Sequence, residues 1–306
     1  MRSFYTVLIL ILLVNINGIA QTKENQNPKD GTFGSISTSF PDVSEGDVDW
    51  GDFNRDGYLD LLICGNDGTL NHTKIYSNDG DETFTEISFD LPDIYNGIIR
   101  WTDFNNDGLL DIFLSGDLDN NTGDFITNPI TELYSNNGDS TFTQISFSFT
   151  GLYVCDAVWA DFNNDGWQDL IIAGDDGDYA KTEYYINNGD STFNLQSGPF
   201  TNVQNADIDV LDYNKDGYKD LIIAGSVNGA SETPGTFLYS NNGDGTFSYM
   251  SDISFAGITY GDIKCADFNS DGFTDIFFIG SHLSSERIAK LYKNNGDSTF
   301  TDTSSF

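Results

Sequence analysis

Residues 52–60 read Asp-Phe-Asn-Arg-Asp-Gly-Tyr-Leu-Asp, and a loop of this kind occurs five times in the 306-residue chain. The other copies start at Asp103, Asp161, Asp212 and Asp267. Every copy has Asp at positions 1, 5 and 9, Asn at position 3, an aromatic residue at position 2 and Gly at position 6. Alternating oxygen side chains around a Gly turn are typical of a calcium loop, which offers four side chains and the carbonyl of position 7.

A loop of Asp, Asn and Gly can also be a simple turn without a metal ion. One copy leaves both interpretations open. Each of the five copies, however, gathers three carboxylates within nine residues, and these would repel one another without a cation. The sequence therefore predicts about five bound Ca²⁺ ions.

The residues after each loop exclude an EF-hand, which needs a Glu at position 12 and flanking helices. Position 12 is apolar in every copy: Ile63, Leu114, Ile172, Ile223 and Phe278. Each loop runs directly into a short apolar segment, such as Leu-Asp-Leu-Leu-Ile-Cys-Gly at residues 59–65. Segments of this length and composition are typical of buried strands, so each loop joins two strands.

The repeat length and its strand signals predict an all-β fold, a β-propeller of four-stranded antiparallel blades. The loop starts are 51, 58, 51 and 55 residues apart. Each repeat also contains a phrase close to Tyr-Ser-Asn-Asn-Gly-Asp-Ser-Thr-Phe, at residues 76–84, 134–142, 185–193, 239–247 and 292–300. Its Asn/Asp-Gly pair indicates a hairpin between the third and fourth strands. A second metal site in this phrase and an elongated calcium-bound solenoid are the alternatives.

The loop, the apolar strand after it and the later Asn-Asn-Gly-Asp phrase together resemble the FG-GAP/VCBS repeat family. That family includes the calcium-binding blades of the integrin α-subunit propeller. The resemblance covers about residues 30–306 and implies that calcium binds between strands 1 and 2 of each blade. The ligands that it implies, with the residue of position 7 contributing its carbonyl, are Asp52, Asn54, Asp56, Tyr58 and Asp60; Asp103, Asn105, Asp107, Leu109 and Asp111; Asp161, Asn163, Asp165, Trp167 and Asp169; Asp212, Asn214, Asp216, Tyr218 and Asp220; and Asp267, Asn269, Asp271, Phe273 and Asp275.

The number of blades depends on the first residues of the repeat region. Residues 30–36 read Asp-Gly-Thr-Phe-Gly-Ser-Ile and resemble a fourth strand without its first three. Five complete repeats follow, and the last one has its own fourth strand at residues 298–303. We expect five blades, with six or more if the chain lacks the blade that the first strand would complete.

Charge and the first residues of the chain predict its location. The chain has 48 acidic and 13 basic residues, a net charge of −35, which argues against binding to nucleic acid or to anionic membranes. Residues 1–20 have Arg2, a short apolar core and a small-residue end, as in a secretory signal peptide, and residues 21–29 read as a polar linker. A retained membrane anchor is the alternative for this segment. We expect a secreted or cell-surface protein without stable membrane insertion.

The three cysteines do not form a disulfide framework. Cys64, Cys155 and Cys265 each occupy a repeat position that other copies fill with small or apolar residues, or with Trp in the case of Cys265. We expect buried thiols.

Nothing in the sequence specifies a catalytic centre, so we expect that the chain is not an enzyme. His72 and His282 lie in loops after the second strands of repeats one and five, with no recurring partner around them. We expect the carboxylates of the repeated loop to bind calcium, so they are not candidates for acid or base catalysis.

The connectivity of a four-stranded meander places the calcium loops and the Asn-Gly hairpins on one face and the variable loops on the other. The variable stretches include residues 66–74, 117–130, 175–181, 227–235 and 281–287. The stretches between repeats carry aromatic residues at loose intervals: Phe40, Tyr95, Tyr153, Phe200 and Tyr260. These side chains either bind a ligand or pack beneath the loops.

We therefore expect an adhesion module that binds an extracellular protein or glycan at the cell surface through its variable face. A carbohydrate-active enzyme, or its propeller module, and a structural scaffold are the two alternatives.

Overall fold

The computed structural model describes residues 40–119, 128–227, 233–283 and 286–303. Within these ranges the chain forms strands and no α-helix, which confirms the predicted all-β fold. The described part of the chain accordingly offers no helical segment that could cross a membrane. The predicted signal peptide, the linker and the strand-like residues 30–36 lie outside the described residues.

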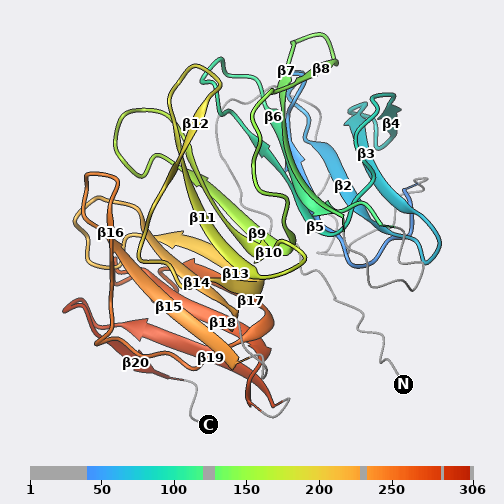
Figure 1. Cartoon of the computed structure of the whole chain (residues 1–306). Helices are drawn as coiled ribbons and strands as arrows, with labels where there is room; N and C mark the ends of the chain where they lie inside the picture. The colour runs from blue at the N-terminus through green and yellow to red at the C-terminus, as the bar shows by residue number, and fades with distance from the viewer. Residues whose placement is uncertain (1–39, 120–127, 228–232, 284–285, 304–306) are drawn as a thin grey trace, which may run out of the picture. The chain divides into compact units, whose positions relative to one another are not determined.

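Five antiparallel meanders follow one another in chain order, each with four strands (Figure 1). Blade 1 consists of β1 (Val48–Gly51), β2 (Asp60–Asn66), β3 (Asn71–Asn78) and β4 (Phe84–Ile87). Blade 2 consists of β5 (Tyr95–Thr102), β6 (Asp111–Asp117), β7 (Pro129–Asn136) and β8 (Phe142–Gln144). Blade 3 consists of β9 (Tyr153–Ala160), β10 (Asp169–Asp175), β11 (Ala180–Asn187) and β12 (Phe193–Gln196). Blade 4 consists of β13 (Val203–Leu211), β14 (Asp220–Val227), β15 (Thr233–Asn241) and β16 (Phe247–Tyr249). Blade 5 consists of β17 (Thr259–Ala266), β18 (Asp275–Ser281), β19 (Arg287–Asn294) and β20 (Phe300–Asp302).

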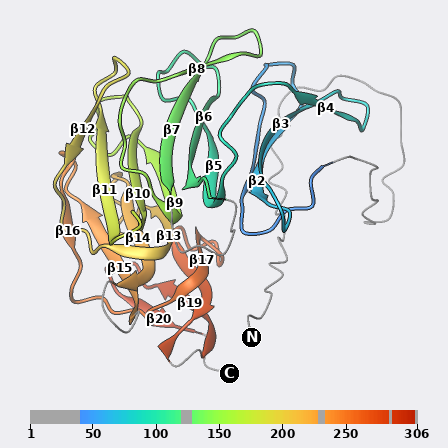
Figure 2. The ribbon, with the colours of Figure 1, turned by 45° about the vertical axis from the view of Figure 1, so that its right-hand side comes forward.

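The meanders are the blades of a β-propeller, and their number agrees with the expected five. The first strands β1, β5, β9, β13 and β17 contact one another in succession, so they are the inner strands (Figure 2). Blades 3 and 4 are joined into one eight-stranded sheet by a single backbone pair, Lys181 with Val203.

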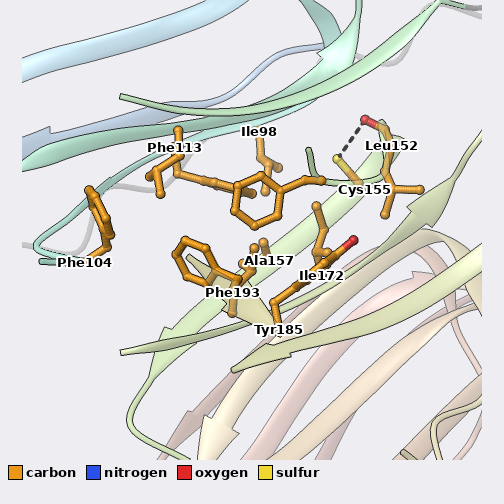
Figure 3. Packing of buried hydrophobic residues seen from close by; sticks show 12 residues of the cluster. Ile98, Phe104, Phe113, Leu152, Cys155, Ala157, Ile172, Tyr185 and Phe193 are labelled. Atoms are coloured by element: carbon orange, nitrogen blue, oxygen red, sulfur yellow. Dashed lines mark hydrogen bonds between the residues drawn. The ribbon is translucent and has the colours of Figure 1, made fainter. Parts of the chain in front are cut away.

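Apolar side chains on both faces of each second strand hold the blades together. In β10, Leu170 and Ile172 pack toward blade 2, whereas Ile171 packs toward blade 4. Strands that are covered on both faces consist of continuous apolar runs. This explains why apolar and polar residues do not alternate in the second strands. Four clusters of buried side chains fill the four junctions between consecutive blades, and Figure 3 shows the one between blades 2 and 3.

Candidate functional site

The five predicted calcium loops have one common backbone geometry. Position 4 is a residue other than Gly with φ between 54° and 61°, and the Gly of position 6 has φ between 80° and 93°. A positive φ costs Gly little but strains residues with a side chain, so Gly suits position 6. The positive φ at this position makes the sharp turn that the sequence predicted. The members at position 4 are Arg55, Asn106, Asn164, Lys215 and Ser270.

Side-chain oxygens inside each loop accept backbone N–H groups of the same loop. In the first copy, the two oxygens of Asp52 accept the amides of Asp56 and Gly57, each at 3.0 Å. Asn54 Oδ1 also accepts the amide of Asp56, at 2.9 Å, and Asp56 Oδ1 accepts the amide of Tyr58 at 2.9 Å. The third and fifth loops repeat this pattern. The side chains of positions 1, 3 and 5 therefore line the inside of one tight turn.

The Asp at position 9 is buried in every copy, with at most 1% of its surface exposed: Asp60, Asp111, Asp169, Asp220 and Asp275. One oxygen of each accepts an amide from the later Asn-Gly hairpin, as in Asn136 N to Asp111 Oδ1 at 2.8 Å. Burial, followed by the neighbouring carboxylates, raises the pKa of Asp111 to about 7 despite that hydrogen bond. Burial likewise raises the pKa of Asp220 to about 7. A nearby cation would favour the ionised form of these groups.

Buried carboxylate oxygens without a hydrogen-bond partner indicate whether calcium suits the loops. Asp103 Oδ1 and Asp111 Oδ2 in the second loop and Asp212 Oδ1 in the fourth are buried without a hydrogen-bond partner. In the described ranges no three acidic or other metal-binding side chains converge on one point, because backbone amides hold the loop carboxylates. Buried oxygens without donors are costly, and a hard cation is the partner that an all-oxygen donor set takes. The residues present therefore fit calcium in their donor chemistry, although their carboxylates do not converge on one point in this structure; the side chains of positions 1, 3, 5 and 9 and the carbonyl of position 7 would hold the ion.

Each loop rests on the Asn-Gly hairpin of its own blade. The side chain at position 7 covers the hairpin Gly so closely that a Cβ on Gly80 would stand 2.4 Å from the Tyr58 ring, and one on Gly189 would stand 2.5 Å from the Trp167 ring. The hairpin acid bonds its own turn, as in Asp139 Oδ1, which accepts the amide of Thr141 at 3.1 Å. The phrase therefore forms a tight turn, as expected.

The first Asn of the hairpin phrase ties its blade to the preceding one. Asn136 Nδ2 donates to the carbonyl of Phe53 in the loop of blade 1 and to that of Leu110 in its own loop, both at 3.0 Å. The equivalent residues that bridge the next three junctions are Asn187, Asn241 and Asn294. The same Asn side chain therefore holds the loop of its own blade and the loop of the preceding blade, so a change in a loop also affects the contact between the two blades.

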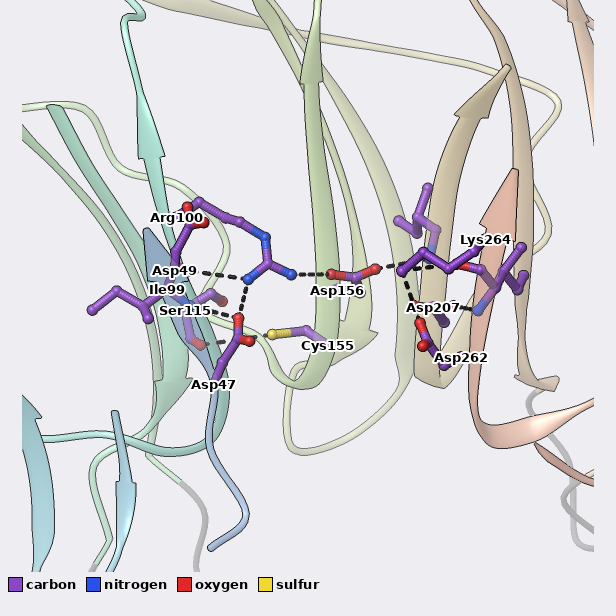
Figure 4. Close-up of polar contacts among 12 residues, drawn as sticks. Asp47, Asp49, Ile99, Arg100, Ser115, Cys155, Asp156, Asp207, Asp262 and Lys264 are labelled. Atoms are coloured by element: carbon purple, nitrogen blue, oxygen red, sulfur yellow. Dashed lines mark hydrogen bonds and ion pairs between the residues drawn. The ribbon is translucent and has the colours of Figure 1, made fainter. Parts of the chain in front are cut away.

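The inner strands carry a second polar network that sequence reasoning missed (Figure 4). Asp156 on β9 accepts the amide of Ile208 on β13 at 2.8 Å, and Asp207 accepts the amide of Ile263 on β17. The Arg100 guanidinium bridges Asp47 and Asp156. The signal was present, since an Asp stands five residues before the loop in four of the five repeats: Asp47, Asp156, Asp207 and Asp262.

Two carboxyl groups of this network, those of Asp207 and Asp156, have different surroundings. Burial, followed by the charge of Asp156, raises the pKa of Asp207 well above its usual range. Asp156 in turn faces the Arg100 guanidinium, with 3.0 Å between Arg100 Nη2 and Asp156 Oδ1. Like charges held together in a partly buried place favour one protonated and one ionised member. The pair could therefore supply an acid and a base side by side.

The aromatic residues predicted for the variable face divide into two groups. The centroid of the Phe200 ring lies 5.1 Å from that of Tyr239 and 5.2 Å from that of Phe247. Tyr95 is 8% exposed. These two side chains therefore pack beneath the loops. Tyr260 is 63% exposed, and Tyr153 and Phe40 are half-buried. Of the two alternatives, packing beneath the loops therefore describes Phe200 and the largely buried Tyr95, whereas Tyr260 is the most exposed of the five.

Tyr153 lies close to residues from three blades. Its pKa is raised to about 12, first by burial and then by the charges of Asp175, Asp117, Tyr95 and Tyr260. A bulge with positive φ recurs at the start of the inner strands, at Asn96, Val154, Asn205 and Tyr260. Tyr95, Tyr153 and Tyr260 stand at or next to these bulges at the starts of β5, β9 and β17, and we call them the tyrosine mouth.

The structure agrees with the expectation of buried thiols for Cys64 and Cys155, and it places His72 in β3 rather than in a loop. His72 Nε2 lies 2.8 Å from Asp67 Oδ2, and His282 Nδ1 lies 2.6 Å from the carbonyl of Gly257. Cys64 and Cys155 are buried free thiols, and Cys265 is a half-buried one. Burial raises the pKa of Cys155 to about 12, so its thiol is unreactive at neutral pH.

A family model described as FG-GAP-like repeat matches four overlapping stretches of the chain, residues 52–114, 103–172, 161–223 and 212–278. Each match runs from one calcium loop to the second strand of the following blade. No curated protein sequence matches the chain.

Solved structures similar to this chain include a β-fructofuranosidase from Schwanniomyces occidentalis complexed with fructosyl-erythritol, at 12% identity and a TM-score of 0.43. The match covers 88% of this chain but only 61% of that protein. A mannose phosphorylase from Leishmania mexicana in complex with phosphate matches at 10% identity and a TM-score of 0.38, over 85% of this chain and 87% of the other. A fructofuranosidase from S. occidentalis complexed with fructose matches at 13% identity and a TM-score of 0.41, over 88% and 62% of the two chains.

These comparisons contradict the expectation that the chain is not an enzyme, because the similar structures are a fructofuranosidase and a mannose phosphorylase. At identities of 10–13%, the likeness concerns the fold alone and assigns no reaction or substrate to this chain.

Proposed function

Because the chain belongs to the family of FG-GAP-like repeat proteins, we propose that it is a secreted, calcium-stabilised β-propeller that binds an extracellular glycan at the tyrosine mouth. The observation that carries this proposal is the position of Tyr95, Tyr153 and Tyr260 at the same end of the inner strands β5, β9 and β17. Export is supported by the signal-like residues 1–20, and calcium by the buried loop oxygens that lack a partner.

The chemistry of the mouth suits a sugar better than a charged ligand. Tyr rings present a flat apolar face and a hydroxyl, and carboxylates accept hydrogen bonds from hydroxyl groups. The net charge of −35 would repel an anionic polymer, so a neutral or cationic glycan is the class of ligand that we expect.

We predict that Tyr260→Ala abolishes binding on a glycan array without lowering the melting temperature, because the Tyr260 side chain is 63% exposed. The matched control is Tyr179→Ala, which removes a tyrosine that is 64% exposed on the turn before β11 and outside the mouth. The control should bind like the wild type. An equal loss of glycan binding in both variants would exclude the tyrosine mouth as the binding site. An array on which the wild type binds no glycan would exclude it as well.

The inner-strand acids favour a second candidate, a carbohydrate-active enzyme. Hydrolysis of a glycosidic bond uses one protonated carboxyl group as an acid and one ionised carboxylate as a nucleophile or base. Burial raises the pKa of Asp207, as the acid of such a pair requires, and Asp156 lies next to it and is paired with the Arg100 guanidinium.

We predict that Asp207→Asn removes polysaccharide-degrading activity, measured by the release of reducing ends. Activity of the wild type should fall as pH rises through the raised pKa of Asp207, because the acid is lost when it ionises; Asp156, Asp262, Lys264 and Arg100 are the charged groups around it. The control is Asp209→Asn, whose carboxylate also accepts an inner-strand amide, that of Cys265 at 2.7 Å, outside the pair. Unchanged activity in Asp207→Asn would exclude the pair as the catalytic groups.

A further inference from the structure

The face that each blade turns toward the next blade is buried in the first four blades and open in the fifth. Its centre is a pair of apolar residues on the second and third strands, exposed by at most 1% in blades 1 to 4: Leu62 with Ile75, Phe113 with Leu133, Ile171 with Tyr184, and Ile222 with Leu238. The fifth pair is Phe277 with Leu291. Phe277 is 44% exposed and Leu291 is half-buried, so nothing in the described part of the chain covers this pair fully.

Two more positions extend the open face. Ile279 is 45% exposed, whereas the equivalent residues Cys64, Ser115, Ala173 and Ala224 are exposed by at most 1%. Phe268 in the fifth loop is 53% exposed, whereas Phe53, Phe104, Phe162 and Tyr213 are exposed by at most 3%. We call Phe268, Phe277, Ile279 and Leu291 the fifth-blade face.

The size of Ile279 indicates what can cover this face. Where one blade stacks on the next, the position holds a small side chain, because the inner strand of the following blade lies against it. An isoleucine there would overfill such a junction, and interiors packed at protein density do not absorb extra methylene groups without strain. The face is therefore shaped for a layer other than a regular blade of this chain.

Charges flank the apolar residues in a self-complementary order. In the pairing of β17 with β18, Lys264 lies opposite Phe277 and Asp262 lies opposite Ile279. The two charged side chains are 69% and 54% exposed, with 2.8 Å between Lys264 Nζ and Asp262 Oδ1. A two-fold axis between the two rows would place the acid of one copy beside the base of the other.

We propose that the fifth-blade face is a dimer interface at which a second copy of this chain packs its own fifth-blade face in two-fold symmetry. An exposed apolar patch rimmed by charges marks an interaction site, and a symmetric dimer needs one self-complementary patch. Two sheets can pack in this way about 10 Å apart with their apolar side chains between them. The proposal rests on blade 5 alone, and the four residues of the fifth-blade face belong neither to the tyrosine mouth nor to the pair of Asp156 and Asp207.

Sedimentation velocity of the full chain in calcium buffer, over a wide range of protein concentrations, tests the proposal. The wild type should form a dimer, and Phe277→Lys should shift it to a folded monomer, because the Phe277 side chain is 44% exposed within its own chain. The matched control is Tyr249→Lys on β16, where the tyrosine is 46% exposed and lies away from this face. The control should remain dimeric.

Charge reversal separates a two-fold interface from other coverings of the same face. Asp262→Lys and Lys264→Asp should each weaken the dimer, and the double variant should restore it, because the two charges exchange places across the axis. A wild type that stays monomeric at every concentration would overturn the proposal, as would a dimer that survives Phe277→Lys. A monomer would indicate that another part of the chain, or a different protein, covers the face.

Discussion

Removal of calcium with a chelator should lower the melting temperature of the protein by tens of degrees or unfold it. Extracellular calcium loops bind with dissociation constants of roughly 10⁻⁴ to 10⁻³ M. At about a tenfold excess of calcium over that constant, one site contributes about 1.4 kcal/mol to the free energy of unfolding. Five such sites contribute on the order of 7 kcal/mol, which is comparable with the whole stability of a typical domain.

The structure explains why the loss of calcium would destabilise more than the loops themselves. The Asp of position 9 accepts an amide from the hairpin whose Asn also holds the preceding blade, so a relaxed loop loosens a junction as well as a turn. Scanning calorimetry with and without chelator measures the effect. Calcium should restore the original curve and magnesium should not, because magnesium requires a smaller, near-octahedral site. A melting curve that the chelator leaves unchanged would mean that the loops are turns without a metal ion.

The second large effect is expected from Asn187→Ala. Asn187 is 1% exposed, and its side chain donates to the carbonyls of Phe104 and Gln168 at 2.8 and 3.0 Å. Truncation leaves these two buried acceptors without a donor, at a cost of about 2–4 kcal/mol. For a chain of this size the melting temperature should fall by about 5–15 °C.

The neighbouring Asn188→Ala is the matched control for this prediction. Asn188 belongs to the same hairpin phrase but is exposed, and it bonds only within its own blade, to Thr192 and Asn194. Urea unfolding at saturating calcium should show a large shift of the midpoint for Asn187→Ala and a small one for Asn188→Ala. Equal shifts would mean that the bridge to the preceding blade does not stabilise the protein.

Local chemistry made the calcium loops and their strands predictable from the sequence. The Asp-Phe-Asn-Arg-Asp-Gly pattern of the first loop fixes its turn within six residues, and the apolar run of β2 needs no distant partner to indicate a buried strand. The Asn-Asn-Gly-Asp phrase predicted its tight turn for the same reason. The four-stranded blade followed from the repetition of these signals.

Features that depend on neighbouring blades were not predictable. Arg100 acquires its role only because Asp47 and Asp156, from the blades on either side, face it across the inner strands. Phe200 and Tyr95 are buried by contacts that the loop sequence does not specify, and the sequence gives Phe277 the same pattern as its buried equivalents.

The central claim is that each of the five loops holds one calcium ion, and the metal content of the protein tests it most directly. Equilibrium dialysis against calcium, followed by elemental analysis, should give about five ions per wild-type chain. Asp56→Ala should give about four, with the remaining loops keeping the protein folded. A wild-type protein that retains no calcium, or an Asp56→Ala variant with the same calcium content as the wild type, would contradict the account.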